Sequence, residues 1–354
     1  MTSNLKIEPS FFAEPPKRFA WVGLLLLGAL LFFLNTWGYD LWPADEPRFG
    51  QVAREMMESG NLVAPQINGL PYKEKPPLLF WAITLASKPF GDVTEFSARA
   101  PSVVAALLIL MLTYALGNRM YGRRVGLWAG LILATSVLFC WEARSVRTDM
   151  LLSAAMTVCL WSMWRWHETW RRHWLVIFYL ALGAGLYAKG PAALVFPALS
   201  IVVFFRKNGK ERARLHWPIG FAAALAMVLL WYIPARAALP AEDTAVVASG
   251  MGVGVWNEFV RQIIGRIFLG VSKAQWPWYY IANLPLPLFP WSLFLPWIVI
   301  WTWRHRKEDD KMRFLLSWVV PAFVFFSIMI GKRDVYILPV YPAVAIISAR
   351  AILD

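Results

Sequence analysis

Long runs of apolar residues alternate with short charged segments along the whole chain. The first run, FAWVGLLLLGALLFFLNTW at 19–37, carries no charge and is long enough to cross a bilayer as a helix at about 1.5 Å per residue. Further runs lie at 100–117, 125–141, 149–164, 174–188, 190–205, 217–235, 284–303, 314–330 and 335–353. Together they predict an all-α multi-pass membrane protein with about ten transmembrane helices.

The composition agrees with this prediction. Of the 354 residues, 58% are hydrophobic and only 16% are charged, whereas soluble domains carry about 25% charged residues. The formal net charge is +13, but basic residues of membrane proteins gather in cytoplasmic loops and beside lipid phosphates. We therefore expect membrane lipids as partners and no nucleic acid. Neither cysteine has metal-ligand spacing, so no metal site is indicated. The sequence leaves the use of a divalent ion open.

Lysine and arginine in the connecting segments predict the orientation. The polar segment 1–18 ends in Lys17 and Arg18 and shows no cleavage site, so we expect a cytoplasmic N-terminal segment followed by a retained first span. Four further short segments, NRMYGRR, RWHETWRRH, RKNGKERARLH and RHRKEDDKMR, are also basic. The opposite, outer face then holds segment 38–99, the turns around 142–148 and 189, loop 236–283 and GKRD at 331–334.

Segment 38–99 contains a predicted amphipathic helix. Within DEPRFGQVAREMMESGN, five apolar residues share one helical face: Phe49, Val52, Ala53, Met56 and Met57. Pro47 suits a first helical turn, and Gly60 is a natural stop. With Arg48 on its polar side, this helix should lie along the membrane surface.

Asp45, at the start of that helix, has two interpretations. Aspartate commonly caps a helix by accepting a hydrogen bond from a first-turn amide. The other interpretation is a carboxylate that acts as a general base at the membrane surface. The two are not exclusive.

The stretch YKEKPP at 72–77 forms a stiff elbow because each proline disfavours the helical conformation of the residue before it. Lys75 would then lie on a rigid backbone just outside the acyl region, where it could hold a phosphate whose lipid tail stays in the bilayer. An interfacial lysine that only snorkels toward water is the alternative.

Three further clusters fall on the outer face. EARSVRTDM places Asp149 at the start of a span, AKGP places Lys189 in a tight turn, and GKRDVYILPVYP carries Lys332, Arg333 and Tyr336. A transporter would need ionisable groups near the membrane midplane, where these spans have almost none. An enzyme acting on a lipid-linked phosphate needs cations for the leaving group and a carboxylate for the acceptor. The distribution therefore favours an interfacial enzyme.

In succession, the motifs DEPRFGQVAREMMESGNLVAPQINGLPYKEKPPLLFW, SVRTDM, AKGP and GKRDVYILPVYPAVAI resemble the bacterial protein O-mannosyltransferase-like (PMT-type) glycosyltransferases. The most similar type is the transferase that adds 4-amino-4-deoxy-L-arabinose to lipid A. The resemblance implies the GT-C fold over 19–354, a bacterial inner-membrane location, and inverting transfer from an undecaprenyl-phosphate sugar on the periplasmic face, with 38–99 as the first periplasmic loop. Family members usually continue into a C-terminal periplasmic domain, which is absent here, so the chain is expected to be compact or a fragment.

Carried over by motif, the resemblance makes Asp45 the catalytic acidic residue and Asp149 a second acidic position. Lys75 matches a contact to the donor phosphate, and Tyr72 lies beside it. We also expect substrate contacts from the basic and aromatic residues of the other outer-face motifs: Arg48, Lys189, Lys332, Arg333 and Tyr336.

The sequence leaves open both the acceptor and the class of protein. The acceptor could be lipid A, a protein or another envelope glycan. A polyprenyl-lipid flippase is the alternative from a different class of protein. A purely structural membrane subunit is the last alternative, but it would give the YKEKPP elbow no function. We expect a monomer; no cofactor is indicated, and a divalent metal stays open.

Overall fold

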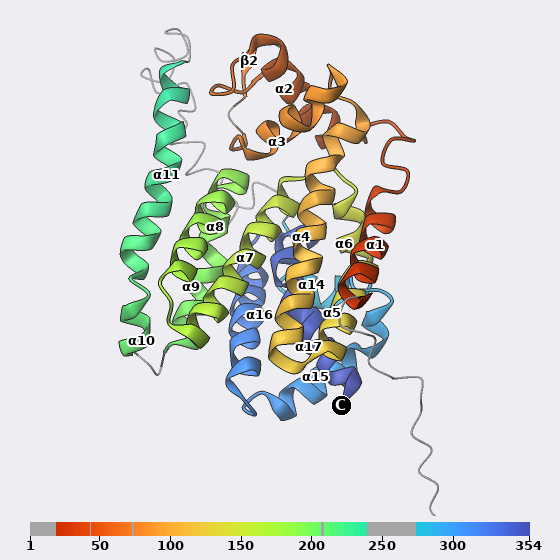
Figure 1. Cartoon of the computed structure of the whole chain (residues 1–354), viewed down its shortest axis with the longest axis vertical. Coiled ribbons are helices and arrows are strands. Elements are labelled where there is room, and N and C mark those ends of the chain that lie inside the picture. Colours follow the sequence, from red (N-terminus) through yellow and green to blue (C-terminus); the bar gives the residue numbers. More distant parts are fainter. Residues whose placement is uncertain (1–18, 43, 73, 207–208, 239–273) are drawn as a thin grey trace, which may run out of the picture.

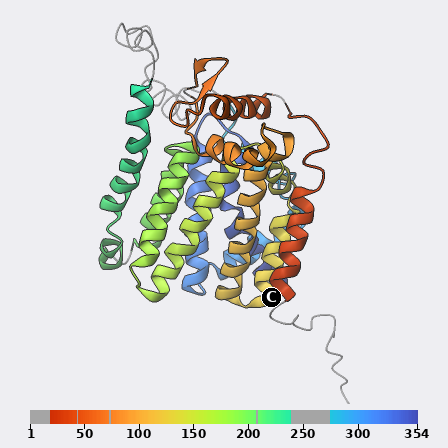
Figure 2. The ribbon, with the colours of Figure 1, turned by 45° about the horizontal axis from the view of Figure 1, so that its top comes forward.

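The computed structural model describes residues 19–42, 44–72, 74–206, 209–238 and 274–354. It is a bundle of upright helices with a smaller layer lying across one end (Figures 1 and 2). The helices before residue 150 are α1 Phe19–Phe33, α2 Asp45–Ser59, α3 Leu78–Ser87, η2 Lys88–Phe90, α4 Glu95–Tyr121, α5 Arg123–Thr135, α6 Val137–Ala143 and α7 Thr148–Thr169. Those after it are α8 His173–Lys189, α9 Ala192–Phe204, α10 Gly209–Arg214, α11 Trp217–Ala237, α14 Tyr279–Asn283, η3 Trp291–Phe294, α15 Leu295–His305, α16 Asp310–Ile328, η4 Asp334–Val340 and α17 Tyr341–Leu353.

The centre of the bundle is formed by α4, α7 and α17. Helix α4 packs against α5 and α7, while α7 also packs against α8, and α17 packs against α5. Helix α11 stands at the side of the bundle, where it packs against α8 (Figure 2). Its most apolar window is only 11% buried within the protein, as expected for a helix that faces lipid.

The protein is a multi-pass membrane protein, but the prediction of about ten spans is not confirmed. Among the described residues, four helical segments are long and apolar enough to cross a bilayer: Glu95–Tyr121, Trp217–Ala235, Asp310–Ile328 and Asp334–Leu353. A fifth is possible if α5 and α6, which are bent by 69° relative to each other, count as one. Helix α7, which covers the predicted span 149–164, has 22 residues but is not among these four segments, and the other predicted spans correspond to shorter helices.

The run 284–303 is the clearest departure from the predicted spans. Four prolines, Pro285, Pro287, Pro290 and Pro296, interrupt it, and its only α-helix is the 11-residue α15 at its end, which follows the short 3-10 helix η3. Proline removes an amide donor and clashes with the preceding turn, so apolar composition alone could not make this run a continuous helix.

The break between α5 and α6 is stabilised by that same proline-rich segment. The amide of Val137 donates to the carbonyl of Phe289 at 3.1 Å, and the amide of Leu138 donates to Pro287 at 3.0 Å. Irregular backbone inside a membrane protein is tolerated when other protein groups satisfy its hydrogen bonds. The two interrupted helical segments therefore stabilise each other.

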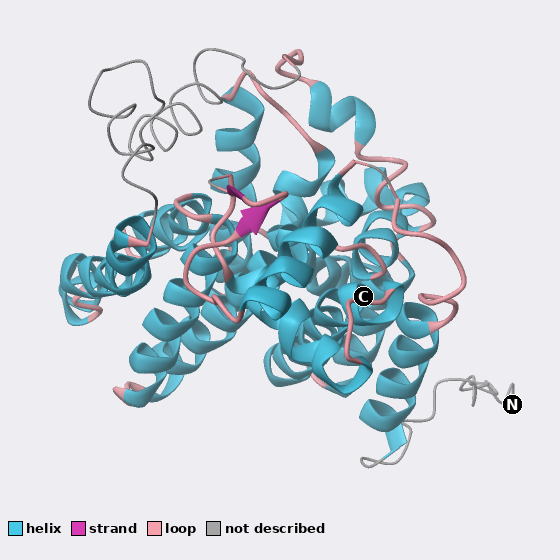
Figure 3. Cartoon of the chain, turned by 90° about the horizontal axis from the view of Figure 1, so that it is seen from above, coloured by secondary structure: helices cyan, strands magenta, loops and turns pink. Residues whose placement is uncertain are grey.

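The layer at the end of the bundle is built from segment 34–94. As predicted, α2 is amphipathic: it buries Phe49, Val52, Ala53 and Met56, and it ends at Gly60, whose φ of 66° suits glycine. A two-stranded antiparallel hairpin follows, with β1 at Gln66–Ile67 and β2 at Leu70–Pro71, joined by Asn68 and Gly69 (Figure 3). This hairpin is a small exception to the all-α prediction.

Helices α3 and α4 complete this layer. The apolar α3, not predicted as a separate element, follows the elbow directly and buries one face against α2 and α4. The long helix α4 begins at Glu95, earlier than the predicted boundary at residue 99, because Thr94 and Ser97 form a reciprocal capping box. Most of the predicted outer loop 236–283 lies outside the described residues.

Candidate active site

Asp45 is the first residue of α2 and binds two arginines. Its Oδ1 accepts a hydrogen bond from Arg48 Nη2 at 2.7 Å, and its Oδ2 is paired with Arg147 Nη1. The helix is preceded by Ala44 and has no side-chain cap. The N-cap interpretation of Asp45 is therefore wrong: the carboxylate turns away from the first-turn amides toward two cations.

Glu46, the next residue, is a structural carboxylate that the sequence analysis did not single out. It is 4% exposed. Its Oε2 accepts from Arg99 Nη2 and from the Trp42 amide, both at 2.8 Å, while Oε1 accepts from the Val146 amide at 2.7 Å. Because these partners come from three separate segments, Glu46 fixes the start of α2 relative to α4 and to the 144–147 turn.

Arg99 completes this anchor from inside α4. Its side chain is fully buried and lies 3.8 Å from the ring centre of Tyr39. Besides Glu46, its guanidinium donates to the backbone carbonyls of Thr36, Tyr39 and Asp40 at 2.7–2.9 Å. Arg99 thus holds the connection between α1 and α2, and Glu46 positions the adjacent Asp45.

The YKEKPP elbow lies next to Asp45 through Arg48. The second guanidinium nitrogen of Arg48, Nη1, donates to Glu74 Oε2 at 3.0 Å. Tyr72 is buried and its hydroxyl also donates to Glu74, at 3.4 Å. Burial and the Glu74 charge raise the pKa of Tyr72, so its hydroxyl remains a donor. Lys75 is half-buried on non-helical backbone, as the prolines predict.

Asp149 and Lys189, from two distant motifs, form an ion pair. Asp149 lies in the first turn of α7 and Lys189 is the last residue of α8. The Lys189 Nζ is bonded to Asp149 Oδ1 and lies 4.7 Å from the ring centre of Tyr336 in η4. The side chains of the pair are 11–12% exposed. Three of the predicted outer-face motifs therefore meet at one place.

Glu142, near the end of α6, lies between the two groups of ion pairs. It is 3% exposed, and the charges that act on it belong to Asp149, Arg147, Lys189 and Glu46. Glu142 is the first residue of the EARSVRTDM motif but was not predicted as a site residue. The sequence did contain a signal for Glu142, because a glutamate at the end of an apolar run is costly to bury and is therefore a candidate functional residue.

Lys332 and Arg333 do not join these ion pairs through any described contact. Lys332 is 2% exposed and its ammonium donates to the carbonyls of Met329 and Gln275, the latter at 3.0 Å. Burial lowers its pKa. Arg333 has an exposed side chain, and its carbonyl accepts from Tyr280. These contacts favour a structural role for Lys332, and substrate contact by either residue stays a prediction.

The arrangement brings cations and carboxylates together at one end of the bundle. Arg48, Lys75, Arg147 and Lys189 supply positive charge, and Asp45, Glu142 and Asp149 supply carboxylates. Such a group can stabilise a departing phosphate and take a proton from an acceptor. Among the described residues, no set of three or more His, Cys, Asp or Glu side chains is placed to hold a metal ion.

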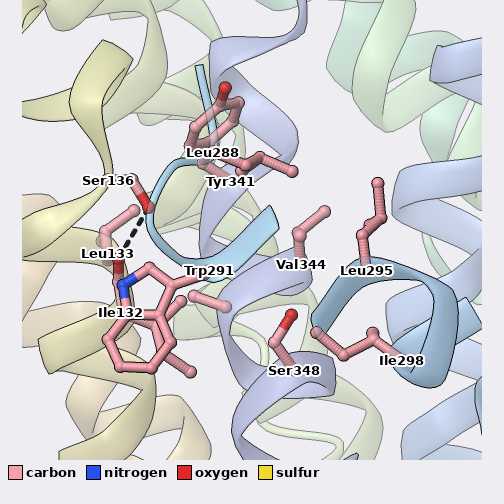
Figure 4. Close-up of a pocket in the computed structure, with 11 residues that line it drawn as sticks. Ile132, Leu133, Ser136, Leu288, Trp291, Leu295, Ile298, Tyr341, Val344 and Ser348 are labelled. Carbon is pink, nitrogen blue, oxygen red and sulfur yellow. Dashed lines mark hydrogen bonds between the residues drawn. The ribbon is translucent and has the colours of Figure 1, made fainter. Parts of the chain in front are cut away.

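A cavity elsewhere in the bundle does not belong to this site. It has a volume of about 20 Å³ and lies between α5, α17 and the segment that leads into α15 (Figure 4). Its lining is apolar apart from Ser136, Tyr341 and Ser348. None of the predicted site residues contributes to it.

Comparison with known protein families gives a match that overlaps this site. The family model described as "Dolichyl-phosphate-mannose-protein mannosyltransferase" matches residues 74–234. The undecaprenyl phosphate-alpha-4-amino-4-deoxy-L-arabinose arabinosyl transferase of Serratia proteamaculans is 29% identical over 93% of the chain and 59% of its own length. The protein of the same name from an Enterobacter species is 30% identical over 92% of the chain and 58% of its own length.

Solved structures give the same result for the fold. ArnT from Cupriavidus metallidurans, crystallised with undecaprenyl phosphate, aligns with a TM-score of 0.80 and 25% identity over 94% of this chain and 60% of its own. The archaeal oligosaccharyltransferase AglB from Archaeoglobus fulgidus has a TM-score of 0.62 at 13% identity, over 95% of this chain and 50% of its own. The predicted GT-C fold is confirmed.

The chain spans about three-fifths of the length of the curated relatives it matches. The Serratia relative and the ArnT structure match 93% and 94% of this chain, respectively. The chain is thus similar to the PMT-type membrane glycosyltransferases and, over about three-fifths of their length, to aminoarabinose transferases.

Proposed function

We propose that the protein is a glycosyltransferase that moves a sugar from an undecaprenyl-phosphate donor to a lipid A-like acceptor. The reaction takes place on the periplasmic face of a bacterial inner membrane. The observation that carries the proposal is the position of Asp45, held by two arginines beside the YKEKPP elbow at one end of the bundle. The names of the matched relatives, which are undecaprenyl phosphate-aminoarabinose arabinosyl transferases, support this donor.

In this proposal Asp45 is the general base. It removes the proton from the acceptor hydroxyl as that oxygen attacks the anomeric carbon of the sugar. The bond from that carbon to the donor phosphate breaks, and undecaprenyl phosphate leaves with the electron pair. Attack opposite the leaving group inverts the anomeric configuration.

Cations replace the general acid that a glycosidase needs. A glycosidase protonates its alcohol leaving group with a second carboxyl group, whereas a phosphate departs as a stable anion. We assign Lys75, which belongs to the elbow, and Arg48, which binds Glu74 of the elbow, to the donor phosphate. Tyr72 supports this surface through Glu74, which also binds Arg48.

We assign the Asp149–Lys189 pair to the opposite side of the site, with Tyr336 against it. The half-buried cation and the aromatic ring would contact the sugar or its phosphate, and Asp149 would hold Lys189 in place. Lys189 is already paired, so its charge is partly neutralised.

A protein acceptor is the second candidate, and the family description favours it. The matched family is described by transfer of mannose to protein. The donor half of the reaction is shared by both candidates, so the roles of Asp45 and Lys75 do not depend on the acceptor.

Replacing Lys75 with alanine tests the donor assignment. One charge-assisted contact to phosphate contributes about 1.5–3 kcal/mol, so donor use by Lys75→Ala should fall by roughly one to two powers of ten. Lys75→Arg should retain part of the activity because the charge survives. The measurement is the rate of undecaprenyl phosphate release by detergent-solubilised protein at varied donor concentration.

The matched control is Lys88→Ala, an exposed lysine of the same outer segment. It should have the donor kinetics of the wild type. Equal donor kinetics for Lys75→Ala and Lys88→Ala would mean that Lys75 only snorkels at the interface.

A further inference from the structure

Glu142 and Arg147 form a long ion pair whose two facing atoms are buried and make no hydrogen bond. Within the described part of the chain, Glu142 Oε2 and Arg147 Nε have no hydrogen-bond partner. The two atoms are 3.9 Å apart. A buried carboxylate oxygen and a buried guanidinium N–H both lose free energy when they are left unpaired. A movement of about 1 Å would bring them to ordinary hydrogen-bond distance.

Arg147 is held on its other side by Asp45. Its Nη1 is paired with Asp45 Oδ2, while its backbone amide is anchored to Ser102 Oγ at 3.4 Å. The backbone is thus fixed, and the guanidinium has two carboxylates within reach. The remaining charges around Glu142 are Glu46, which is saturated by its own partners, and the Asp149–Lys189 pair.

This arrangement bears on the availability of Asp45 as a base. Both Asp45 oxygens are engaged by guanidinium groups. An acceptor hydroxyl that approaches Asp45 therefore competes with these guanidinium N–H groups for the carboxylate oxygens. Of the two arginines, only Arg147 has a second buried carboxylate beside it among the described residues.

We propose, on the basis of the function proposed above, that Glu142 is a positioning residue that draws Arg147 away from Asp45 when substrate occupies the site. The exchange satisfies the two unpaired atoms, releases Asp45 Oδ2 to accept the acceptor proton, and leaves Arg48 to orient the other oxygen. Glu142 itself does not touch the substrate. Its effect on transfer passes through Arg147.

The first test is Glu142→Gln, which keeps the shape of the side chain but removes the charge that attracts Arg147. We expect kcat for transfer from undecaprenyl-phosphate aminoarabinose to lipid A to fall by roughly ten- to a hundredfold, since small misplacements in active sites have effects of this size. The KM for the donor and the thermal midpoint in detergent should stay near those of the wild type, because a merely structural role would move stability instead.

A double-mutant cycle tests the route through Arg147. In an Arg147→Met background, Glu142→Gln should cause no further loss of kcat, because the residue that it positions is gone. Independent losses that multiply in the double variant would overturn the proposal. Wild-type kcat in Glu142→Gln would overturn it as well.

Glu142→Asp keeps the test decisive if the glutamine variant does not fold. It retains the charge but shortens the reach to Arg147, so a smaller loss of kcat at unchanged donor KM is expected, and wild-type kcat would contradict the proposal. The matched control is Asp92→Asn, in an exposed aspartate–arginine pair of the same outer layer, which should leave kcat unchanged. Absence of transfer by the wild type would refute the proposed function itself, whereas an active wild type with indifferent Glu142 variants refutes only this inference.

Discussion

Asp45→Asn should transfer sugar at least about a hundredfold more slowly than the wild type, because general-base catalysis contributes about 10²–10⁴ in rate. Asparagine keeps the size of the side chain and can still accept a hydrogen bond from Arg48, but it cannot take a proton. Asp45 makes no capping hydrogen bond, so the fold of α2 does not depend on it. Its ion pairs are partly exposed, and such pairs contribute only about 0–1 kcal/mol to stability.

The experiment compares kcat, donor binding and thermal midpoint for Asp45→Asn and Glu58→Gln. Glu58 is an exposed carboxylate of the same helix, so its change to an amide should leave all three quantities as in the wild type. Asp45→Asn should bind undecaprenyl phosphate normally and fail in transfer. Transfer near the wild-type rate would remove Asp45 as the base and make Asp149 the leading candidate.

The largest loss of stability is expected at the buried pair of Glu46 and Arg99. Removing one partner of such a pair leaves an uncompensated buried charge and costs about 3–5 kcal/mol. Glu46→Ala strands the fully buried Arg99 guanidinium and also removes the acceptor for the Trp42 and Val146 amides. We therefore expect a strongly lowered thermal midpoint in detergent, together with lost activity, because Asp45 is the adjacent residue.

Two further variants separate this effect from a general weakness of the outer layer. In the double variant Glu46→Gln with Arg99→Met, neither buried charge remains, so part of the stability should return relative to Glu46→Ala. Asp92→Asn disrupts an exposed pair of similar length and should change the stability by about 0–1 kcal/mol. A Glu46→Ala protein as stable as Asp92→Asn would show that Glu46 does not anchor α2.

Much of the site could be predicted from the sequence because its residues lie in local motifs. The apolar stripe of α2, the stop at Gly60 and the stiffness of the elbow follow from periodicity and from backbone restrictions. The positive-inside pattern placed the outer motifs on one face, and the structure brings Asp149, Lys189 and Tyr336 together there.

The parts that could not be predicted depend on partners distant in sequence. Arg99 looks like an ordinary basic flank of an apolar run, and nothing local shows that it binds three carbonyls and Glu46, residues about 53–63 positions away. Asp45 looked like a cap because capping is a local rule, but Arg147, 102 positions later, competes for it. The prediction of a span at 284–303 was wrong because it gave more weight to the apolar composition of the run than to its prolines.

The most direct test of the proposed function is mass spectrometry of an acceptor after incubation with the purified protein and an undecaprenyl-phosphate sugar. The account predicts that lipid A gains the mass of one aminopentose residue while undecaprenyl phosphate is released in equal amount, and that Asp45→Asn gives neither product. A protein acceptor that gains the sugar instead would retain the chemistry and correct the acceptor. An intact donor after incubation with every acceptor would contradict the account.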